Sequence, residues 1–301
     1  MQIVVIGGTR FVGPKLVKAL ERAGHTVTVV HRATQRCPYS THIHDSRANL
    51  AKHNLKADVV VDTHAMTEQD AQDLLAADIA PRVVVLSSGD VYRQFDLLLG
   101  RETGAPEPTP LTEDAALRTQ LYPHRHMAKS ESDMPYWYDK ILVERAVMQH
   151  PGATVLRLPV VYGPGDYQHR FGLWISEMDK HATSISMPEG QDQWRWSRAF
   201  VDNAADAIAL AATNDKAAGR TYNIAEPDAL TDHQWLELFA RTIGWHGLVN
   251  LAKDVKEAEN IHWQYDLTLD STRIREELGY RERVQRMEAL VRTVEWERSQ
   301  R

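Results

Sequence analysis

A glycine-rich turn directly follows an apolar run at the start of this chain. The run Ile3–Ile6 is short and β-branched, and the turn GGTRFVG leads into the amphipathic segment Val12–Ala23. A strand, a tight turn and a helix in this order place the helix N-terminus in front of a pyrophosphate. The glycines fit a tight turn, a loop that approaches phosphate and close packing of helix on strand. The sequence therefore predicts a dinucleotide site at the turn, lined by Gly7, Gly8, Thr9, Arg10, Phe11, Val12 and Gly13.

Strand and helix signals alternate through the first half of the chain. The expected strands are Ile3–Ile6, Thr26–Val30, His42–His44, Val59–Val61, Val83–Leu86 and Thr154–Leu158. The expected helices are Val12–Ala23, Arg47–Leu55, Glu68–Ala77 and Tyr136–Gln149. Short β-branched strands divided by helices are typical of a parallel sheet covered on both faces. The pattern predicts an α/β protein with a doubly wound, parallel-sheet Rossmann fold.

The chain changes character after residue 165, where aromatic residues become frequent. We expect residues 1–165 to form the nucleotide-binding domain, with later elements, about 198–226, returning to it. Residues 166–301 are expected to form mainly a small C-terminal α/β lobe for the substrate. Its expected elements are Phe171–Lys180, Asn203–Ala212, Tyr222–Ile224, Trp235–Ile243 and Val284–Trp296.

Composition excludes several other classes of protein. The net charge is −6 with no long basic run, which disfavours binding to nucleic acid through phosphate contacts. The single cysteine, Cys37, fits a reducing compartment, and no leader segment or run of ~20 apolar residues is present. We therefore expect a cytoplasmic protein without a membrane segment. The histidines, including His124 and His126, lack partners at metal-site spacing and are interpreted as solvated, so no metal is predicted.

The residues after the second strand bear on the choice of cofactor. His31 and Arg32 stand where an NAD-specific site usually has an acidic residue, and a 2′-phosphate prefers arginine. NADP(H) is therefore favoured, with Arg10 as a second cation; NAD(H) stays open if Arg32 is an ordinary surface residue. Asp45 is a candidate acceptor for the adenine amino group, or else a helix N-cap. Ala65 follows the fourth strand at the edge where ligands bind in such folds.

A tyrosine and a lysine four residues apart suggest the chemistry. On one helix, Tyr136 and Lys140 would lie on the same face, and the ammonium would lower the pKa of the phenol. Ser88, at the end of the fifth strand, could hold a substrate hydroxyl or carbonyl, with Ser87 as its competitor and as a cofactor contact. Tyr138 and Tyr92 are the aromatic alternatives, but only Tyr136 has the four-residue offset to a lysine. The pattern predicts a nicotinamide enzyme with a tyrosine acid/base.

The segment 93–134 interrupts the alternation between these candidate residues. It is rich in proline and small polar residues, and we expect it to cover the substrate side of the site. Further along, Asp166, Arg195 and Arg198 are candidates for contact with a phosphorylated or acidic substrate, unless they form ordinary surface ion pairs.

At these residues the chain resembles the extended short-chain dehydrogenase/reductase family, the NAD(P)-dependent epimerase/dehydratase group. The similarity runs from Met1 to about Arg281. Its matching motifs are GGTRFVG, ADVVVD at Ala57–Asp62, LSSGDVY at Leu86–Tyr92, PLTED at Pro110–Asp114, YWYDK at Tyr136–Lys140, LRLPVVYGPGD at Leu156–Asp166 and YNIA at Tyr222–Ala225. The resemblance implies a triad of Ser88, Tyr136 and Lys140, with Pro159 bordering the nicotinamide.

The departures from the family pattern concern the substrate. Val160 stands where nucleotide-sugar enzymes usually have an asparagine, and Gly89-Asp90 replaces the acidic pair of sugar dehydratases, which leaves Asp90 and Val160 as substrate contacts. Arg10 replaces the middle glycine of the turn, and in this the chain resembles an atypical branch of the family that includes epimerases, reductases and RNA-binding proteins. The sequence predicts an NAD(P)-dependent epimerase, dehydratase or reductase acting on a hydroxyl or carbonyl of a sugar or nucleotide sugar. The alternative is a non-catalytic nucleotide-binding module in RNA binding or redox sensing. A homodimer is left open.

Overall fold

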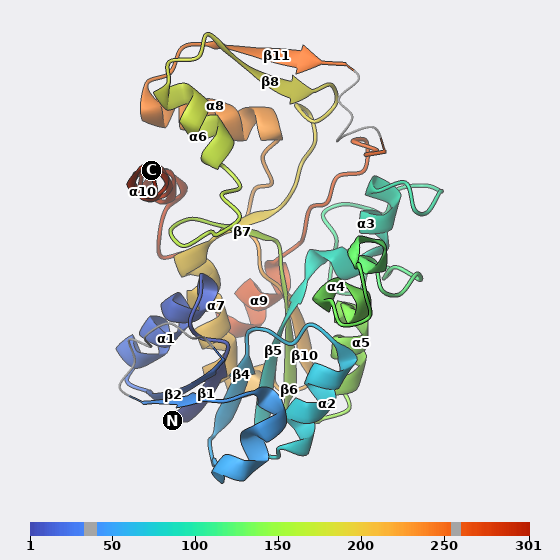
Figure 1. Ribbon diagram of the computed structural model, residues 1–301, viewed down its shortest axis with the longest axis vertical. Helices are drawn as coiled ribbons and strands as arrows, with labels where there is room; N and C mark the ends of the chain where they lie inside the picture. The colour runs from blue at the N-terminus through green and yellow to red at the C-terminus, as the bar shows by residue number, and fades with distance from the viewer. Residues whose placement is uncertain (33–40, 254–259) are drawn as a thin grey trace.

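A seven-stranded parallel sheet forms the centre of the computed structural model, which describes residues 1–32, 41–253 and 260–301 (Figure 1). The strand order is β10-β6-β5-β4-β1-β2-β3, and each neighbouring pair is parallel. The strands are β1 (Gln2–Ile6), β2 (Thr26–His31), β3 (His42–His44), β4 (Val59–Asp62), β5 (Arg82–Ser88), β6 (Ala153–Leu158) and β10 (Arg220–Asn223). The predicted doubly wound α/β fold is confirmed.

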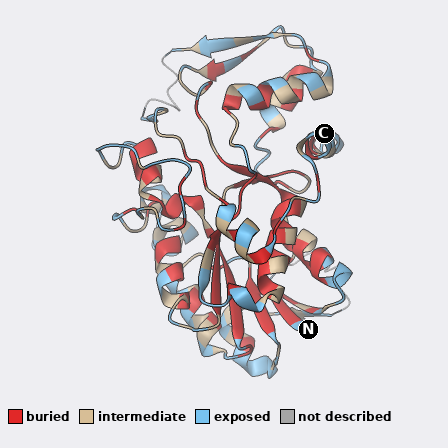
Figure 2. Ribbon diagram, turned by 180° about the vertical axis from the view of Figure 1, so that it is seen from behind, coloured by how far each residue is buried: buried red, intermediate tan, exposed pale blue. Residues whose placement is uncertain are grey.

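Helices cover both faces of this sheet. On one face α1 (Val12–Arg22) packs against α7 (Val201–Thr213), and on the other α2 (Glu68–Ala76) packs against α5 (Lys140–Val147). Side chains alternate between the faces along each strand: Val5 belongs to the core under α1 and α7, and Val4 to the core under α2 and α5. Figure 2 shows the resulting buried layer along the strands. The expected helix 47–55 is a 3-10 helix, Arg47–His53.

A second layer of elements follows residue 165, beyond the carboxyl edge of the sheet. A two-stranded sheet of β8 (Ser184–Pro188) and β11 (Leu248–Ala252) packs with α6 (Gly172–Asp179) and α8 (Asp232–Ile243) at the end of the molecule away from the N-terminus (Figure 1). The chain enters this lobe through β7 (Val160–Tyr162) and leaves it through the paired strand β9 (Arg198–Phe200). It then returns to the main sheet through α7 and β10. The division at residue 165 stays a proposal.

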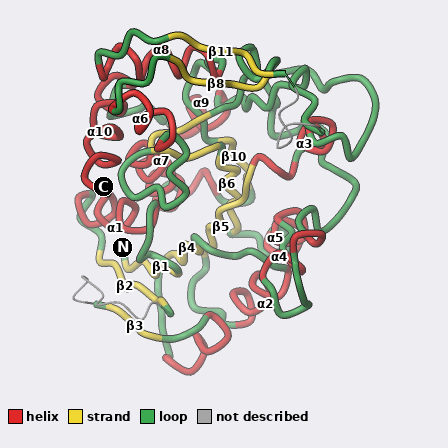
Figure 3. The backbone as a smooth tube through the Cα atoms, turned by 45° about the horizontal axis from the view of Figure 1, so that its top comes forward, coloured by secondary structure: helices red, strands yellow, loops and turns green. Residues whose placement is uncertain are grey.

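The segment 93–134 is folded against the body of the protein. It begins with α3 (Arg93–Leu98), and Leu111 pairs with Leu269 in an isolated bridge. Arg118, 2% exposed, forms an ion pair with the fully buried Asp139 at the start of α5. The backbone of this segment runs beside α4 (Met134–Trp137) and α5 (Figure 3). These contacts place its last part next to the residues of the predicted site.

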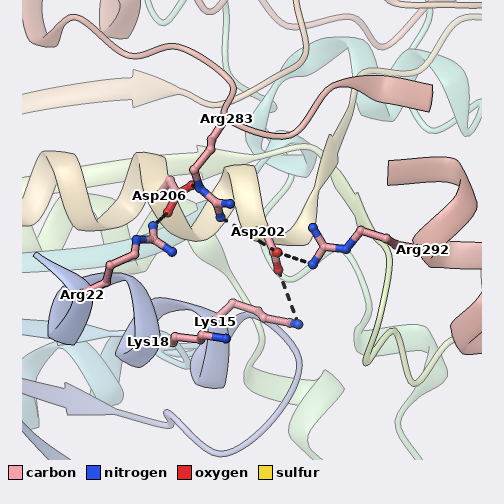
Figure 4. A pocket seen from close by; sticks show the side chains of 7 residues that line it. All are labelled: Lys15, Lys18, Arg22, Asp202, Asp206, Arg283 and Arg292. Carbon is pink, nitrogen blue, oxygen red and sulfur yellow. Dashed lines mark hydrogen bonds and ion pairs between the residues drawn. The ribbon is translucent and has the colours of Figure 1, made fainter. Parts of the chain in front are cut away.

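The last two helices are α9 (Thr272–Leu278) and α10 (Arg286–Ser299), and a charged cluster links α10 to α1 and α7. Asp202 of α7 accepts from Arg292 of α10 at 2.5 Å and lies 3.4 Å from Lys15 of α1. Asp206 binds Arg22 and Arg283 in the same way, at 2.6 and 2.8 Å (Figure 4). Five cations surround two carboxylates around a small cavity, so the cluster carries a net positive charge.

Candidate active site

Several loops meet at the carboxyl edge of the sheet. Because β1, β4, β5 and β6 are parallel neighbours, the residues that follow them lie side by side. The glycine turn follows β1, Asp62 ends β4 and Ser88 ends β5. This is the edge at which open α/β sheets bind their ligands.

The glycine turn fits a phosphate cradle. Gly7 has φ +82°, and α1 begins without a side-chain cap or an acidic residue in its first turn. Of its first three positions, Gly13 donates to Arg10 O and Pro14 has no N–H, which leaves the Val12 amide for an anion. A Cβ on Gly13 would lie 2.6 Å from the backbone carbon of Gly8, so helix and turn pack as closely as predicted. A Cβ on Gly8 would lie 3.1 Å from the side chains of Val5 and Val29, so the core requires a small residue here. The expected approach of Gly8 to a phosphate stays a prediction.

The other turn residues and the end of β2 form the outer side of this site. Thr9 and Gly13 complete the turn, since their amides donate to Gly7 O and Arg10 O. The Phe11 ring packs edge-on against Tyr167, and Val12 opens α1. Within the described residues, neither Arg10 nor Arg32 forms an ion pair, and both are exposed. Their guanidinium groups are therefore available to an anionic ligand.

His31 and Asp45 lie at the ends of β2 and β3. His31 is buried, and its Nε2 lies 3.1 Å from His42 Nδ1. The Asp45 carboxylate accepts from Asn49 and His53, and these hydrogen bonds lower the pKa of Asp45 to about 2. Asp45 thus binds the 3-10 helix from the loop position before its N-cap, which is Ser46. The predicted contact with adenine stays a prediction.

Lys140 is held below the edge of the sheet. Its ammonium donates to Ala65 O at 2.6 Å and to Leu86 O at 2.9 Å, which ties the ends of β4 and β5 together. Burial lowers the pKa of Lys140 to about 8. Two of its three donors are engaged in this way, so one remains for a ligand such as a ribose hydroxyl.

Tyr136 and Lys140 do not share a helix, and the predicted helix 136–149 is wrong in this respect. Tyr136 lies in the short helix α4, and α5 begins only at Lys140. Asp139 separates them, because its side chain caps α5 by accepting from the Ile141 amide at 2.9 Å. The Tyr136 hydroxyl donates to Glu131 at 3.0 Å, and the Arg125 guanidinium lies 4.5 Å from the centre of its ring.

Tyr138 occupies the place beside Ser88 instead. Its hydroxyl donates to Asp90 Oδ2 at 2.7 Å, and the Ser88 side chain accepts from the amide of the same Asp90 at 3.3 Å. Ser88 also lies near enough to affect the pKa of the phenol. Burial, and then the Asp90 charge, raise the pKa of Tyr138 well above its ordinary value. His124, from the segment 93–134, lies 3.7 Å from Asp90 Oδ2, with its ring centre 5.0 Å from that of Tyr138.

Asp90 is buried but charged. Burial raises its pKa, but the nearby His124 side chain, the hydrogen bond from Tyr138 and the Arg118 charge together lower it by more, so the net shift is downward. Its Oδ1 is buried, and within the part of the chain that the structure describes no group donates to it. A buried carboxylate oxygen without a donor is costly, so Oδ1 is a natural acceptor for a hydroxyl of a bound ligand.

Ser87 points away from these residues. Successive residues of a strand face opposite sides, and the Ser87 hydroxyl donates to Glu144 at 2.5 Å inside the protein. Glu144 also pairs with Arg157, whose guanidinium donates to the Tyr92 hydroxyl at 3.0 Å. Both Ser87 and Tyr92 thus belong to a buried polar network under the site, which leaves Ser88 as the serine at the edge.

The candidate substrate residues of the second half fall into two places. Val160 pairs in register with Arg198 and directly follows Pro159, which separates β6 from β7. Arg198 is buried, donates to Asp232 at 2.5 Å and lies 4.9 Å from the Trp235 ring centre. Arg195 donates to Ala229 O, and Asp166 pairs with Arg170. Both arginines therefore have protein partners, which is the alternative left open for them.

His124, which the sequence led us to interpret only as a solvated histidine, lies beside the candidate site. It lies 36 positions after Ser88 in a segment without periodic structure, so no spacing rule connects the two. No group of three or more histidine, cysteine or acidic side chains in residues 1–32, 41–253 and 260–301 could hold a metal ion. No helix in those ranges is both long and apolar enough to cross a bilayer.

The chain belongs to the NAD dependent epimerase/dehydratase family, whose sequence profile matches residues 3–225. This confirms the predicted family and, with it, a class of NAD-dependent epimerases, dehydratases and reductases. A curated relative, 2'-dehydrokanamycin reductase of Streptomyces kanamyceticus, is 27% identical over 262 residues, which are 80% of this chain. The match covers 65% of that relative's length.

Solved structures of two epimerases share the fold. UDP-glucose-4-epimerase from Stenotrophomonas maltophila, with bound NAD and formylated UDP-arabinopyranose, superposes with a TM-score of 0.77 at 16% identity, covering 100% of this chain and 98% of that one. UDP-glucuronic acid 4-epimerase from Bacillus cereus, in complex with UDP-glucuronic acid and NAD, gives 0.74 at 18% identity, with full coverage of both chains. At these identities the likeness concerns the fold alone.

Proposed function

We propose that this protein interconverts a hydroxyl and a carbonyl group on a sugar ring, with a nicotinamide dinucleotide as hydride carrier. The carrying observation is that the glycine turn, Lys140 and the group Ser88, Asp90 and Tyr138 lie along one edge of the sheet. A phosphate cradle at one end and a buried acid/base group at the other suit a dinucleotide that reaches from the turn to a substrate.

The residues of the turn and of β4 and β5 fit the cofactor. The Val12 amide at the start of α1 would hold the pyrophosphate, and the remaining donor of Lys140 would hold a ribose hydroxyl. The bound nicotinamide supplies or accepts hydride. Ser88 and the orphan oxygen of Asp90 would orient two neighbouring substrate oxygens, the first by donating and the second by accepting.

The finer choice of cofactor is NADP(H). Arg32 and Arg10 have no protein carboxylate as a partner in the described ranges, so both are available for a 2′-phosphate. A charge-assisted bond of this kind is worth about 1.5–3 kcal/mol, or a factor of roughly 10–150 in affinity. Arg32→Ala should weaken NADPH binding by that factor and leave NADH nearly unchanged. Arg241→Ala, on α8 in the lobe, is the matched control. Tighter binding of NADH by the unaltered protein contradicts this choice.

The substrate class follows from the polar groups and from the relative. The 2'-dehydrokanamycin reductase is named for a ketone on an amino sugar ring, and the epimerase structures hold UDP sugars. Gly89 leaves Asp90 without a second acid beside it, which favours simple reduction or epimerisation over dehydration. We place a polyhydroxylated ring against Asp90 Oδ1 and Ser88.

The test is turnover of a defined panel. The protein is incubated with NADPH or NADH and 2'-dehydrokanamycin, and with NADP⁺ or NAD⁺ and UDP-glucose or UDP-glucuronic acid. Nicotinamide absorbance reports net redox change, and mass spectrometry with NMR reports epimers. Conversion of any member supports the proposal, and Asp90→Asn should abolish it. Tight NADPH binding without any conversion, joined by RNA binding at physiological salt, would replace it with the non-catalytic module.

A further inference from the structure

Two tyrosines flank the break before α5, and only one faces the site. Tyr136 donates to Glu131, an exposed residue of its own segment, and its ring packs against Trp137 with centres 4.9 Å apart. Tyr138 donates to Asp90 at the edge of the sheet, next to Ser88. Tyr136, four residues before Lys140, therefore does not place its phenol in the site, whereas Tyr138, two residues before Lys140, does.

The break that causes this is anchored by buried charge. Asp139 accepts from Arg118 at 2.8 Å, from the Tyr122 amide at 2.6 Å and from Ile141 as the cap of α5. If the Asp139 carboxylate left this position, the buried Arg118 guanidinium would lose its counter-charge, which is strongly unfavourable. The chain cannot continue α5 back through Tyr136 while these bonds hold.

We propose that Tyr138, rather than Tyr136, exchanges the proton with the substrate oxygen, and that Asp90 and His124 carry this proton to and from solvent. The inference rests on the proposed function for the existence of a reacting oxygen. Its own basis is the chain of contacts Ser88–Tyr138–Asp90–His124, in which the Tyr138–Asp90 bond is 2.7 Å.

The direction of proton movement follows from the charges. Because the phenol of Tyr138 has a raised pKa, it is protonated at neutral pH and cannot simply act as a phenolate base. In reduction, the carbonyl carbon takes hydride, the oxygen takes the Tyr138 proton, and Tyr138 regains a proton from His124 through Asp90. In oxidation, Tyr138 accepts the hydroxyl proton as it gives its own to Asp90, which passes it to His124, and hydride leaves the carbon. Each direction moves one proton and one hydride.

His124 connects this chain of contacts to water. Its side chain is 28% exposed, whereas that of Asp90 is 8% exposed. Histidine exchanges protons readily near neutral pH. The 3.7 Å separation from Asp90 is an ion-pair distance, so a small movement of the ring or one bridging water completes the hydrogen bond. Lys140, engaged by Ala65 and Leu86, then serves the edge of the sheet and the cofactor rather than the phenol.

The first experiment compares matched tyrosine variants on any panel substrate that the unaltered protein converts. Tyr138→Phe should lose about 10²–10⁴-fold in kcat and keep its cofactor affinity, because only the titrating oxygen is removed. Tyr136→Phe should keep its rate within about threefold. His124→Ala should be slowed, and added imidazole should restore its rate, which a packing role alone would not allow. Full activity in Tyr138→Phe, or loss in Tyr136→Phe alone, overturns the inference while leaving the proposed function intact.

A second measurement needs no substrate. In protein carrying ¹³Cζ-labelled tyrosine, the deuterium isotope shift gives the rate at which each phenol hydrogen exchanges with solvent. His124→Gln and Asp90→Asn should slow the exchange of Tyr138 by at least about tenfold and leave Tyr136 unchanged, because only Tyr138 is proposed to exchange through these groups. Equal exchange of Tyr138 in all three proteins overturns the relay, whether or not any panel substrate reacts.

Discussion

Arg118 and Asp139 form an ion pair in which both side chains are completely buried, with Nη2 2.8 Å from Oδ1. Arg118 also donates to Asp90 O at 3.0 Å, and Asp139 caps α5. One ion pair thus fixes the segment 93–134, the break after Tyr136 and the backbone of the residue that binds Tyr138. The placement of the candidate acid/base group depends on this pair.

Arg118→Met should destabilise the protein by about 3–5 kcal/mol, because it leaves the Asp139 carboxylate buried without its cation. Urea unfolding followed by circular dichroism measures the change. The control is Lys180→Met, which removes the cation of the exposed pair with Glu177 and should cost at most about 1 kcal/mol. An Arg118→Met protein no less stable than this control would show that the pair does not anchor the segment.

The stability of the protein should depend on Lys140 in a pH-dependent way. Burial lowers the pKa of Lys140 to about 8, below the value of ~10.4 in an unfolded chain. Between these two values the unfolded chain binds more protons, so the Lys140 contribution to stability rises with pH and is lost as pH falls through about 8.

The free energy of unfolding of Lys140→Met, relative to that of the unaltered protein, should therefore be highest near neutral pH and should decline from about pH 8 upward. Urea unfolding of both proteins at a series of pH values gives this difference directly. A difference that stays constant across the series would mean that the ammonium is as well solvated as in the unfolded chain.

Two glycines should respond differently to one methyl group. At Gly13 the new Cβ would lie 2.6–2.9 Å from the Gly8 backbone, while at Gly24 nothing lies within 4 Å and only φ +85° is unfavourable. Gly24→Ala should cost about 1–2 kcal/mol and keep NADPH affinity. Gly13→Ala should push α1 away from the turn and lose NADPH affinity as well. Calorimetric titration of both variants decides, and equal affinities would show that close packing of turn and helix is not needed for the cofactor.

The sequence predicted the main sheet because its signals are local. Runs such as Val83–Leu86 are apolar on both sides, and glycine and helix signals separate them, so strand identity and parallel order follow from chain chemistry. The strands β7 and β9 have three residues each, like the predicted β3, but they were not predicted, because they stand outside the alternation of strands and helices: β7 follows β6 after one residue and β9 runs directly into α7.

The acid/base group was harder to predict for a different reason. The four-residue offset of Tyr136 and Lys140 has meaning only on an unbroken helix, and Asp139 ends that helix by capping α5. An aspartate directly before the apolar run KILVERAV is an N-cap signal, so this error could have been avoided. The position of His124 could not have been predicted, because it depends on how a 42-residue segment folds back through the Arg118–Asp139 pair.

Asp202 should hold the N-terminal helix and the C-terminal helix together. Burial raises the pKa of this carboxyl, but Arg292 and Lys15 together lower it by more, so its pKa lies below the ordinary value. Its contribution to stability is therefore present above the unfolded-state value of ~3.9 and is lost as pH falls through the folded value. In Asp202→Asn the seven side chains of the cluster rise from a net charge of +3 to +4 (Figure 4).

The expected cost of Asp202→Asn at neutral pH is about 1–3 kcal/mol, since charged hydrogen bonds are lost and the cations repel one another. Salt should reduce this cost by screening the repulsion. The control is Glu288→Gln, which removes the exposed i,i+4 partner of Arg292 and should cost less than about 1 kcal/mol. Urea unfolding at several salt concentrations measures both variants. If the cost of Asp202→Asn does not change with salt, then lost packing between α1 and α10, rather than uncompensated positive charge, causes the destabilisation.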